Sequence, residues 1–237
     1  AGMNFPLHYM AYRNRNLGVY LKSPEWKFYV GIVLVACAIT ALGLHLAGGM
    51  VGWEEKIRLA SFQVVSILTT TGFATADYDL WPTMAAGVLF LVMFVGGCVG
   101  STGGNIKPGR YLIMIHRSLI ELKKMVHPKA VLPQRFGDRV LNEDLVLNVV
   151  QFFFLYIMFI ALGTLVLAML GLDIASSLTA TAACLGNIGP GFGLVGPTQN
   201  YAFIPDLGKY LLSILMLIGR LEIFPILVLF LPEYWKQ

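Results

Sequence analysis

The chain has 237 residues, of which 57% are hydrophobic and only 13% charged, and its formal net charge is +4. A soluble domain carries roughly 25% charged residues, so a water-soluble protein is excluded. Several apolar runs reach the roughly 20 residues that cross a hydrocarbon core of about 30 Å, which indicates a polytopic membrane protein. Cys37, Cys98 and Cys184 stand singly without CxxC spacing, which indicates packing residues rather than a metal site or a disulfide.

The first half of the chain is predicted to begin with membrane-spanning segments. Residues 1–10 have the character of the tail of a membrane helix that begins before this chain. A complete span is predicted over 28–46, and the apolar run 57–68 after it is too short to cross the bilayer. We interpret this run as a re-entrant helix, because irregular backbone follows it and is tolerated at membrane depth only beside a wet cavity. An amphipathic surface helix is the alternative.

A loop of threonine and glycine, residues 69–73, follows the short run, and a second span is predicted from Trp81 to Phe94. The apolar pattern of that span ends at a glycine-rich stretch over 96–105 and begins again at Ile106. A nucleotide-binding loop fails as an interpretation, because the stretch matches neither GxxxxGK[ST] nor G-x-G-x-x-G and follows no strand. Small polar residues suit an unwound segment inside the membrane instead.

The second half repeats this order. A span is predicted over 145–170, followed by a short helix over 174–185 that Asp173 is expected to cap. A glycine-rich loop comes next, and the last span, over 210–231, is interrupted at Gly219-Arg220 and Pro225.

The distribution of charge predicts the orientation of the chain. Residues 107–139 hold eight Lys and Arg against two acids, and the positive-inside rule assigns the loops 10–27 and 107–143 to the cytoplasm. The acidic loops 48–56 and 74–82 then lie outside. Membrane topology accounts for the basic run, so a nucleic-acid partner is not expected. The predicted domains are a helix end with a basic linker, a pore repeat, a cytoplasmic linker and a second pore repeat, with bounds 1–27, 28–125, 126–143 and 144–237.

An offset of 117 residues aligns the two halves and brings Gly72 over Gly189. Each short helix then aims its partly negative C-terminal end inward, which favours a cation. Carbonyl oxygens of the following loop can replace a hydration shell, and positive φ at the two glycines can turn successive carbonyls toward one axis. A simple exposed turn is the alternative. The predicted filter consists of Thr69, Thr70, Thr71, Gly72, Phe73, Asn187, Ile188, Gly189 and Pro190.

The predicted fold is therefore an all-α membrane protein with two parallel repeats of span, pore helix, loop and span. Two repeats do not enclose a pore, because a ring of carbonyls needs about four contributors. Either two chains combine, or the chain is half of a longer one, and the helix end at 1–10 favours the second.

Four motifs resemble a known family. They are Thr-Thr-Thr-Gly-Phe (69–73), Gly-Gly-Cys-Val-Gly-Ser-Thr-Gly-Gly-Asn-Ile-Lys (96–107), Asn-Ile-Gly-Pro-Gly (187–191) and Gly-Arg-Leu-Glu (219–222). Together they resemble the membrane subunit of the bacterial Trk/Ktr potassium transporters, and the TrkH-like branch is the closer match. The resemblance implies K⁺ uptake across the inner membrane, with this chain supplying the third and fourth of four repeats. The implied K⁺ ligands are Thr70, Thr71, Gly72, Asn187, Ile188 and Gly189.

The resemblance also implies partners. They are the missing N-terminal half of the same protein, a second copy in a homodimer, membrane lipid and a cytoplasmic nucleotide-binding ring protein that is TrkA-like. We expect no cofactor in this chain apart from the transported K⁺, and no enzymatic activity. One departure from the family is Gly103-Gly104-Asn105, where the family usually has three glycines, and it is expected to stiffen the loop.

A gate is predicted below the filter. Arg220 corresponds to Gly103 by the same offset, so a guanidinium lies at the depth where the other span is unwound. A charge at that depth usually faces a wet interior. A structural contact of Arg220 with Glu222 or with a carbonyl is the alternative. The predicted gate, which blocks cations until the loop moves, consists of Gly100, Ser101, Thr102, Gly103, Gly104, Asn105 and Arg220.

Two other classes of function are alternatives to a K⁺ channel. An intramembrane enzyme would need a Ser–His pair or paired aspartates inside spans, and the histidines lie at span ends or in the basic loop. A K⁺ symporter coupled to H⁺ or Na⁺ is the closer rival, because broken helices also mark such proteins. Only Arg220 and Glu222 could serve there as ionisable coupling residues near the midplane.

Overall fold

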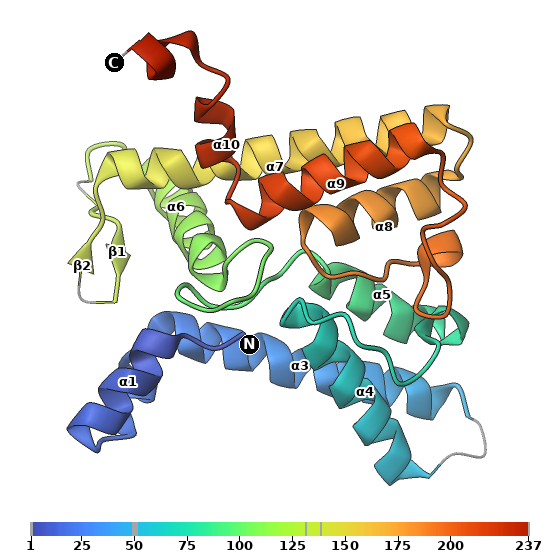
Figure 1. Ribbon diagram of the computed structural model, residues 1–237. Helices are drawn as coiled ribbons and strands as arrows, with labels where there is room; N and C mark the ends of the chain where they lie inside the picture. The colour runs from blue at the N-terminus through green and yellow to red at the C-terminus, as the bar shows by residue number, and fades with distance from the viewer. Residues whose placement is uncertain (1, 49–51, 131, 138, 237) are drawn as a thin grey trace.

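The computed structural model describes residues 2–48, 52–130, 132–137 and 139–236. In these ranges the regular secondary structure is helical apart from one short hairpin (Figure 1). The elements are α1 (Phe5–Asn14), α2 (Gly18–Lys22), α3 (Pro24–Leu46), α4 (Trp53–Leu68), η1 (Tyr78–Leu80), α5 (Thr83–Val92), α6 (Pro108–Val126), β1 (Arg135–Phe136), β2 (Arg139–Val140), α7 (Glu143–Met169), α8 (Ile174–Leu185), η2 (Gly193–Val195), α9 (Asp206–Arg220), α10 (Phe224–Val228) and η3 (Pro232–Lys236). The strands β1 and β2 pair antiparallel in the linker between α6 and α7.

Two helices of the described chain, α3 with 23 residues and α7 with 27, are long and apolar enough to cross a membrane. Helix α3 begins four residues before the expected start at Phe28, because its start has good capping chemistry. The Ser23 hydroxyl accepts a hydrogen bond from the Trp26 amide at 3.3 Å, and Pro24 occupies the first turn, where its missing N–H costs nothing.

The short helices α4 and α8 differ in how well the sequence predicted them. Helix α8 covers 174–185 as expected, and the Asp173 carboxylate caps it by accepting from the Ser176 amide at 2.9 Å. Helix α4 has 16 residues and starts at Trp53, so the predicted start at Ile57 was wrong. Glu54 and Glu55 fill its first turn, where negative charge stabilises the N-terminal end of a helix.

The last span of each half is broken into two helices. Helix α5 ends at Val92, and irregular backbone leads to α6. The predicted span 210–231 begins earlier, at Asp206, and its predicted interruption is confirmed, because α9 ends at Arg220 and α10 follows. Between them Glu222 and Ile223 have φ of 61° and 62°, a conformation that a β-branched residue rarely adopts.

The two halves pack around separate cores that exchange residues at their boundary. Helix α3 packs against α4 and α5, whereas α8 packs against both α7 and α9 (Figure 1). Ile188, from the loop after α8, is buried in the core of the first half, and Ile106 is buried in the core of the second. The two loops that were predicted to bind a cation therefore lie where the halves meet.

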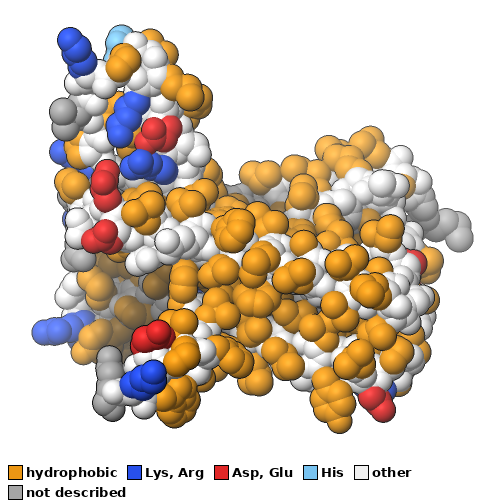
Figure 2. All heavy atoms as spheres, turned by 90° about the horizontal axis from the view of Figure 1, so that it is seen from above, with side chains coloured by type: hydrophobic (Ala, Val, Ile, Leu, Met, Phe, Trp, Pro, Cys, Tyr) orange, Lys and Arg blue, Asp and Glu red, His pale blue; other side chains and the backbone are white. Residues whose placement is uncertain are grey.

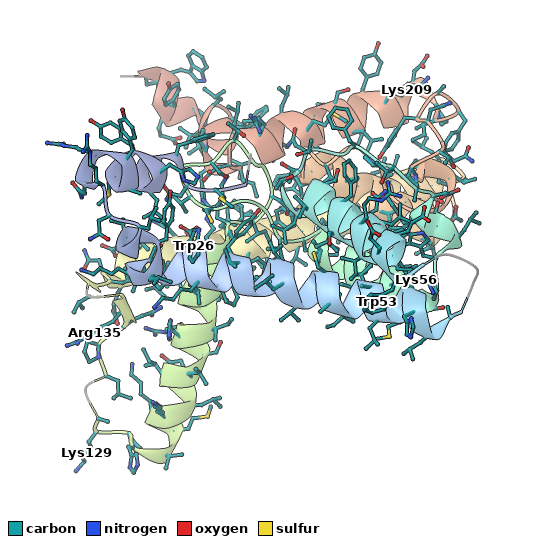
Figure 3. All side chains as sticks on the ribbon, turned by 90° about the horizontal axis from the view of Figure 1, so that it is seen from below. Trp26, Trp53, Lys56, Lys129, Arg135 and Lys209 are labelled. Atoms are coloured by element: carbon teal, nitrogen blue, oxygen red, sulfur yellow. The ribbon has the colours of Figure 1, made fainter. Side chains whose placement is uncertain are left out.

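The surface has the distribution of apolar and charged side chains that is typical of a membrane protein. Figure 2 shows apolar side chains over a broad face, while charged side chains gather at one end. Trp26 and Trp53 lie toward opposite ends of α3, and Lys129 and Arg135 lie beyond the Trp26 end (Figure 3). Aromatic residues at two levels with basic residues beyond one of them are typical of a membrane-embedded chain. The bounds predicted for the two repeats and their linkers stay predictions.

Candidate ion-coordinating site

The loops after α4 and α8 have the same backbone conformation. Thr70 and Asn187 have φ of 53° and 55°, and the glycines two residues later, Gly72 and Gly189, have φ of 77° and 114°. The positive φ expected at the two glycines is present, whereas the left-handed Thr70 and Asn187 were not predicted. A positive φ is uncommon for a threonine, so its match in both loops indicates one shared, specified turn.

Main-chain hydrogen bonds fold each loop back over the end of its helix. The Thr71 amide donates to the Ser66 carbonyl at 2.9 Å, and the Ile188 amide donates to the Ala183 carbonyl at 2.8 Å. These bonds use the amides of the loop and leave its carbonyls pointing elsewhere. The C-terminal ends of both helices are buried, since Leu68 and Leu185 are fully buried.

The carbonyls of both loops are largely without donors. No residue that the structure describes donates a hydrogen bond to the carbonyl oxygens of Thr69, Thr70, Thr71 and Gly72 in the first loop, or of Gly186, Asn187 and Ile188 in the second. Thr71 is exposed, and Thr69, Thr70, Gly72 and Asn187 are half-buried, so much of both rows of carbonyl oxygens lies in segments that a ligand can reach. A desolvated cation would satisfy them.

Two carbonyls that the sequence assigned to the filter are already acceptors. The Phe73 carbonyl accepts from the Ser66 hydroxyl at 2.6 Å, and the Phe73 side chain is exposed. The Gly189 carbonyl accepts from the Tyr201 hydroxyl at 2.8 Å. Each of these two carbonyl oxygens thus already has one hydrogen-bond donor, and the assignment of Phe73 and Gly189 to the filter stays a prediction.

The two loops touch. A Cβ atom built on Gly72 would lie 2.0 Å from the Ile188 carbonyl oxygen and 3.2 Å from the Pro190 ring. Only glycine fits at this contact, and its positive φ adds a second reason. The structure thus brings the two predicted filter segments together, although they are separated by more than a hundred residues in the sequence.

An acidic rim joins the halves on the side where α5 and α9 begin. The Asp79 carboxylate accepts from the Gly193 amide at 3.1 and 3.2 Å, and the buried Tyr78 hydroxyl donates to the Gly191 carbonyl at 3.0 Å. Burial raises the pKa of Asp79, and the Gly193 amide opposes this. Burial likewise raises the pKa of Tyr78, so its hydroxyl stays a donor.

The glycine-rich stretch lies directly beneath the first loop. The Gly104 amide donates to the Thr70 hydroxyl at 2.9 Å, and a Cβ built on Gly103 would lie 3.5 Å from the Thr69 carbonyl oxygen. Of the predicted gate residues, Gly100 and Thr102 are exposed, Ser101 is half-buried, and Gly103 and Gly104 are buried.

Arg220 reaches this stretch. Its exposed guanidinium donates to the Thr102 carbonyl at 2.7 Å, so the structure brings together the two parts of the predicted gate. Glu222 pairs with Arg110 rather than with Arg220. Asn105 has a different place from the rest of the predicted gate, since its buried amide donates to the Met93 carbonyl and accepts from the Tyr156 hydroxyl at 2.7 Å. Asn105 thereby fastens the stretch to α7.

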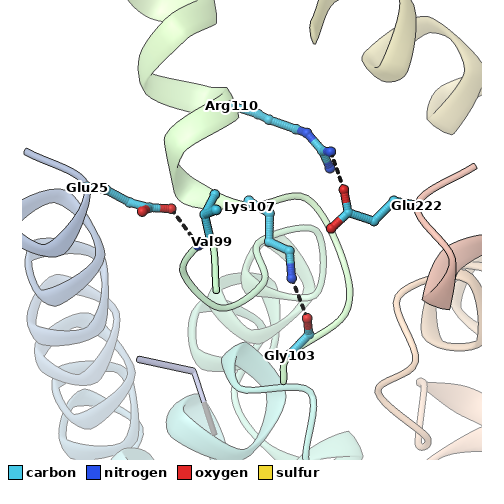
Figure 4. A network of polar contacts seen from close by, with 6 residues as sticks. All are labelled: Glu25, Val99, Gly103, Lys107, Arg110 and Glu222. Carbon is cyan, nitrogen blue, oxygen red and sulfur yellow. Dashed lines mark hydrogen bonds and ion pairs between the residues drawn. The ribbon is translucent and has the colours of Figure 1, made fainter. Parts of the chain in front are cut away.

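Sequence reasoning missed the charged side chains that hold the glycine-rich stretch (Figure 4). The Glu25 carboxylate, from the first turn of α3, accepts from the Val99 amide at 2.8 Å and from the Gly109 amide at 3.2 Å. The buried Lys107 ammonium donates to the Gly103 carbonyl at 2.6 Å. A glutamate beside a span and a lysine inside a glycine-rich motif were the available signals, because such groups are rarely buried without a partner.

These features define the class of protein: an all-α membrane protein with paired loops and broken helices at its centre. Residues 1–237 match the TrkH family, described as a cation transport protein, and the chain belongs to that family.

Individual relatives agree with this assignment. The chain is 36% identical over 237 residues to the Trk system potassium uptake protein TrkH of Salmonella typhimurium, covering all of this chain and 49% of that protein. It is 40% identical over 207 residues to the Trk system potassium uptake protein TrkI of Halomonas elongata, covering 87% of this chain and 42% of that protein. The crystal structure of the potassium transporter TrkH from Vibrio parahaemolyticus superposes with a TM-score of 0.90 at 35% identity, covering 98% of this chain and 50% of that one. The chain spans about half the length of these relatives.

Proposed function

We propose that this chain forms two of the four sides of a K⁺ uptake pathway in a bacterial inner membrane. The observation that carries the proposal is the pair of contacting loops with matching rows of carbonyl oxygens to which no described residue donates. The names of the relatives, which are potassium uptake proteins, support K⁺ as the cation. Remaining parts of the whole protein would supply the other two loops.

Coordination by these carbonyls would replace the hydration shell of the ion. The C-terminal ends of α4 and α8, at Leu68 and Leu185, point their partial negative charge into the same region. Among the described residues no group of three or more His, Cys, Asp and Glu could hold a metal ion. A site made of neutral carbonyls binds K⁺ weakly enough to release it, as conduction requires.

A gate below the filter would consist of residues 100–105 and Arg220. The guanidinium contact with the Thr102 carbonyl supports this part of the proposal, because it sets a positive charge beside the path of a cation. Opening then requires the stretch to move. Glu25 accepts from the Val99 amide, Lys107 donates to the Gly103 carbonyl, and the Arg110–Glu222 pair joins α6 to the segment after α9, so a displacement of α6 would be transmitted to the stretch.

The partners follow from the same proposal. A homodimer and a cytoplasmic nucleotide-binding ring protein of the TrkA type would regulate the gate from the side of α6, whose last turn is basic. Nucleotide would bind to that partner protein and not to this chain. Membrane lipid would cover the broad apolar face seen in Figure 2.

A current–voltage measurement in proteoliposomes tests the proposal, with the whole transporter that contains this chain. A channel predicts reversal at the K⁺ Nernst potential at every pH and every Na⁺ gradient. The second candidate, K⁺ symport coupled to H⁺ or Na⁺, predicts a reversal potential that shifts with the gradient of the coupling ion. The broken helices α5 and α9 keep this candidate open. Absence of any K⁺ current or uptake from folded protein that has been inserted into the liposome membrane would contradict both.

A further inference from the structure

One pair of corresponding positions breaks the match between the two loops. The Gly72 carbonyl has no donor among the described residues, whereas its counterpart at Gly189 accepts from the Tyr201 hydroxyl at 2.8 Å. The preceding carbonyls correspond in both loops, so the difference begins at this level and is caused by one side chain.

Tyr201 reaches Gly189 from the segment between η2 and α9. Its ring packs against the core of the second half. Burial and the neighbouring Cys184 raise the pKa of the Tyr201 hydroxyl, so it stays protonated and remains a donor over the physiological range. Because the hydroxyl oxygen is fixed by a packed ring, the carbonyl it binds is fixed as well.

The backbone after Gly189 is also held, by donors of both halves. The Tyr78 hydroxyl donates to the Gly191 carbonyl at 3.0 Å, and the Gly191 amide donates to the Val195 carbonyl at 2.7 Å. Phe192 exchanges hydrogen bonds with the Thr179 hydroxyl at 3.0 and 3.1 Å. The second loop therefore leaves the ion path at Gly189, one residue earlier than the first loop does.

We infer that Tyr201 is a specificity-determining residue, which holds the Gly189 carbonyl out of the filter and thereby fixes the Ile188 carbonyl as the last ligand of the second loop. This inference rests on the proposed function, because it assumes that the loops select a cation. Gly189 itself cannot provide the rigidity, since glycine at φ 114° has no side chain to lock it.

The consequence concerns discrimination between cations. Selection of K⁺ over Na⁺ depends on the number and field strength of the coordinating carbonyls and on how freely they adjust. Without the hydroxyl, the peptide between Gly189 and Pro190 is released, and the Ile188 carbonyl can follow a smaller ion. Tyr201→Phe should therefore admit more Na⁺ while K⁺ transport continues.

The test is Tyr201→Phe in the whole transporter, with the ratio of Rb⁺ to Na⁺ uptake as the readout. The ring and its packing remain, so the protein is expected to fold and to reach the membrane. We expect the ratio to fall about threefold or more, a change comparable to the net contribution of one hydrogen bond. A purely structural role would lower the amount of transporter and the uptake of both ions together, and leave the ratio unchanged.

Two controls complete the design. Tyr210→Phe removes a hydroxyl from the exposed face of α9 and should leave the ratio as it is. Gly72→Ser tests the filter independently of Tyr201. An unchanged or higher ratio in Tyr201→Phe, together with a lower ratio in Gly72→Ser, overturns the inference and leaves the proposed function intact. If wild-type transporter does not discriminate between the ions at all, the proposed function itself fails.

Discussion

The two halves of the molecule build one loop conformation with different supports. Hydroxyls of its own segment and the glycine-rich stretch hold the first loop: the Thr69 and Thr71 hydroxyls lie 2.7 Å apart, the Ser66 hydroxyl donates to the Phe73 carbonyl, and the Gly104 amide donates to the Thr70 hydroxyl. Residues 186–191 of the second loop carry no hydroxyl, and side chains from other segments hold it. Asn187 donates to the Met216 carbonyl of α9 at 3.1 Å, and Tyr201 holds Gly189.

The helices that carry the loops differ in the same sense. Helix α8 is capped by Asp173 and is buried over most of its length, whereas α4 has Gly52 at its N-cap, which offers no side-chain cap, and is amphipathic. The two halves therefore share the backbone conformation of the loop but stabilise it with different contacts. A substitution in the first loop should act locally, and one in the second half should act through the packing around it.

The largest difference is expected between Gly72→Ser and Gly189→Ser. Both positions have positive φ, but a Cβ at Gly72 meets the Ile188 carbonyl oxygen at 2.0 Å, whereas the nearest atom to one at Gly189 is 3.9 Å away. Gly72→Ser should therefore abolish most of the preference for Rb⁺ over Na⁺, and Gly189→Ser should reduce it less. Competition of Na⁺ with Rb⁺ uptake measures both. Equal selectivity in wild type and Gly72→Ser would remove Gly72 from the filter.

The next effect is at the gate, where one half has a guanidinium and the other a glycine. Arg220→Ala removes a charged hydrogen bond to Thr102, of the kind that contributes roughly 1.5–3 kcal/mol. If that bond holds the closed state, Rb⁺ uptake should rise about tenfold.

Lys209→Ala is the matched control for Arg220→Ala, because it removes an exposed cation from the same helix. Its uptake should equal that of wild type. Unchanged or lower uptake in well-folded Arg220→Ala would mean that the contact with Thr102 is only structural.

A smaller effect is expected for the hydroxyls of the first loop. Thr70→Val keeps the shape of the side chain but leaves the buried Gly104 amide without its acceptor, which costs about 1–3 kcal/mol. Thr71→Val loses only an exposed contact between hydroxyls and should cost less. Thermal unfolding of the detergent-solubilised transporter compares the two. Equal stability of both variants would show that the first loop does not depend on the glycine-rich stretch.

The smallest effect concerns the cap of α8. Asp173→Ala should destabilise the protein by about 1 kcal/mol, and Asp206→Ala, which removes an exposed aspartate, by less. The Ser176 amide lowers the pKa of Asp173, so the stabilisation is complete above the ordinary aspartate pKa and is lost as the pH falls through the lowered value. Unfolding at neutral and at acidic pH should show the difference between wild type and Asp173→Ala disappearing in acid.

Some features could be read from the sequence because they depend on local chemistry. Apolar length predicted α3 and α7, the cap at Asp173 predicted α8, and the shared offset matched Gly72 with Gly189. Others depend on contacts between distant segments. Nothing near Gly189 indicates that Tyr201 binds its carbonyl. The charges of Glu25 and Lys107 stand out in the sequence, but nothing there indicates that they bind Val99 and Gly103.

The central claim is that carbonyls of both loops bind one cation, and anomalous diffraction tests it most directly. Crystals of the transporter that contains this chain would be soaked in Rb⁺, whose anomalous signal marks its position. We expect a peak between the Thr70–Gly72 and Asn187–Ile188 carbonyls, absent when Na⁺ replaces Rb⁺. A peak only at the acidic rim near Asp79, with none between the loops, would contradict a shared carbonyl site.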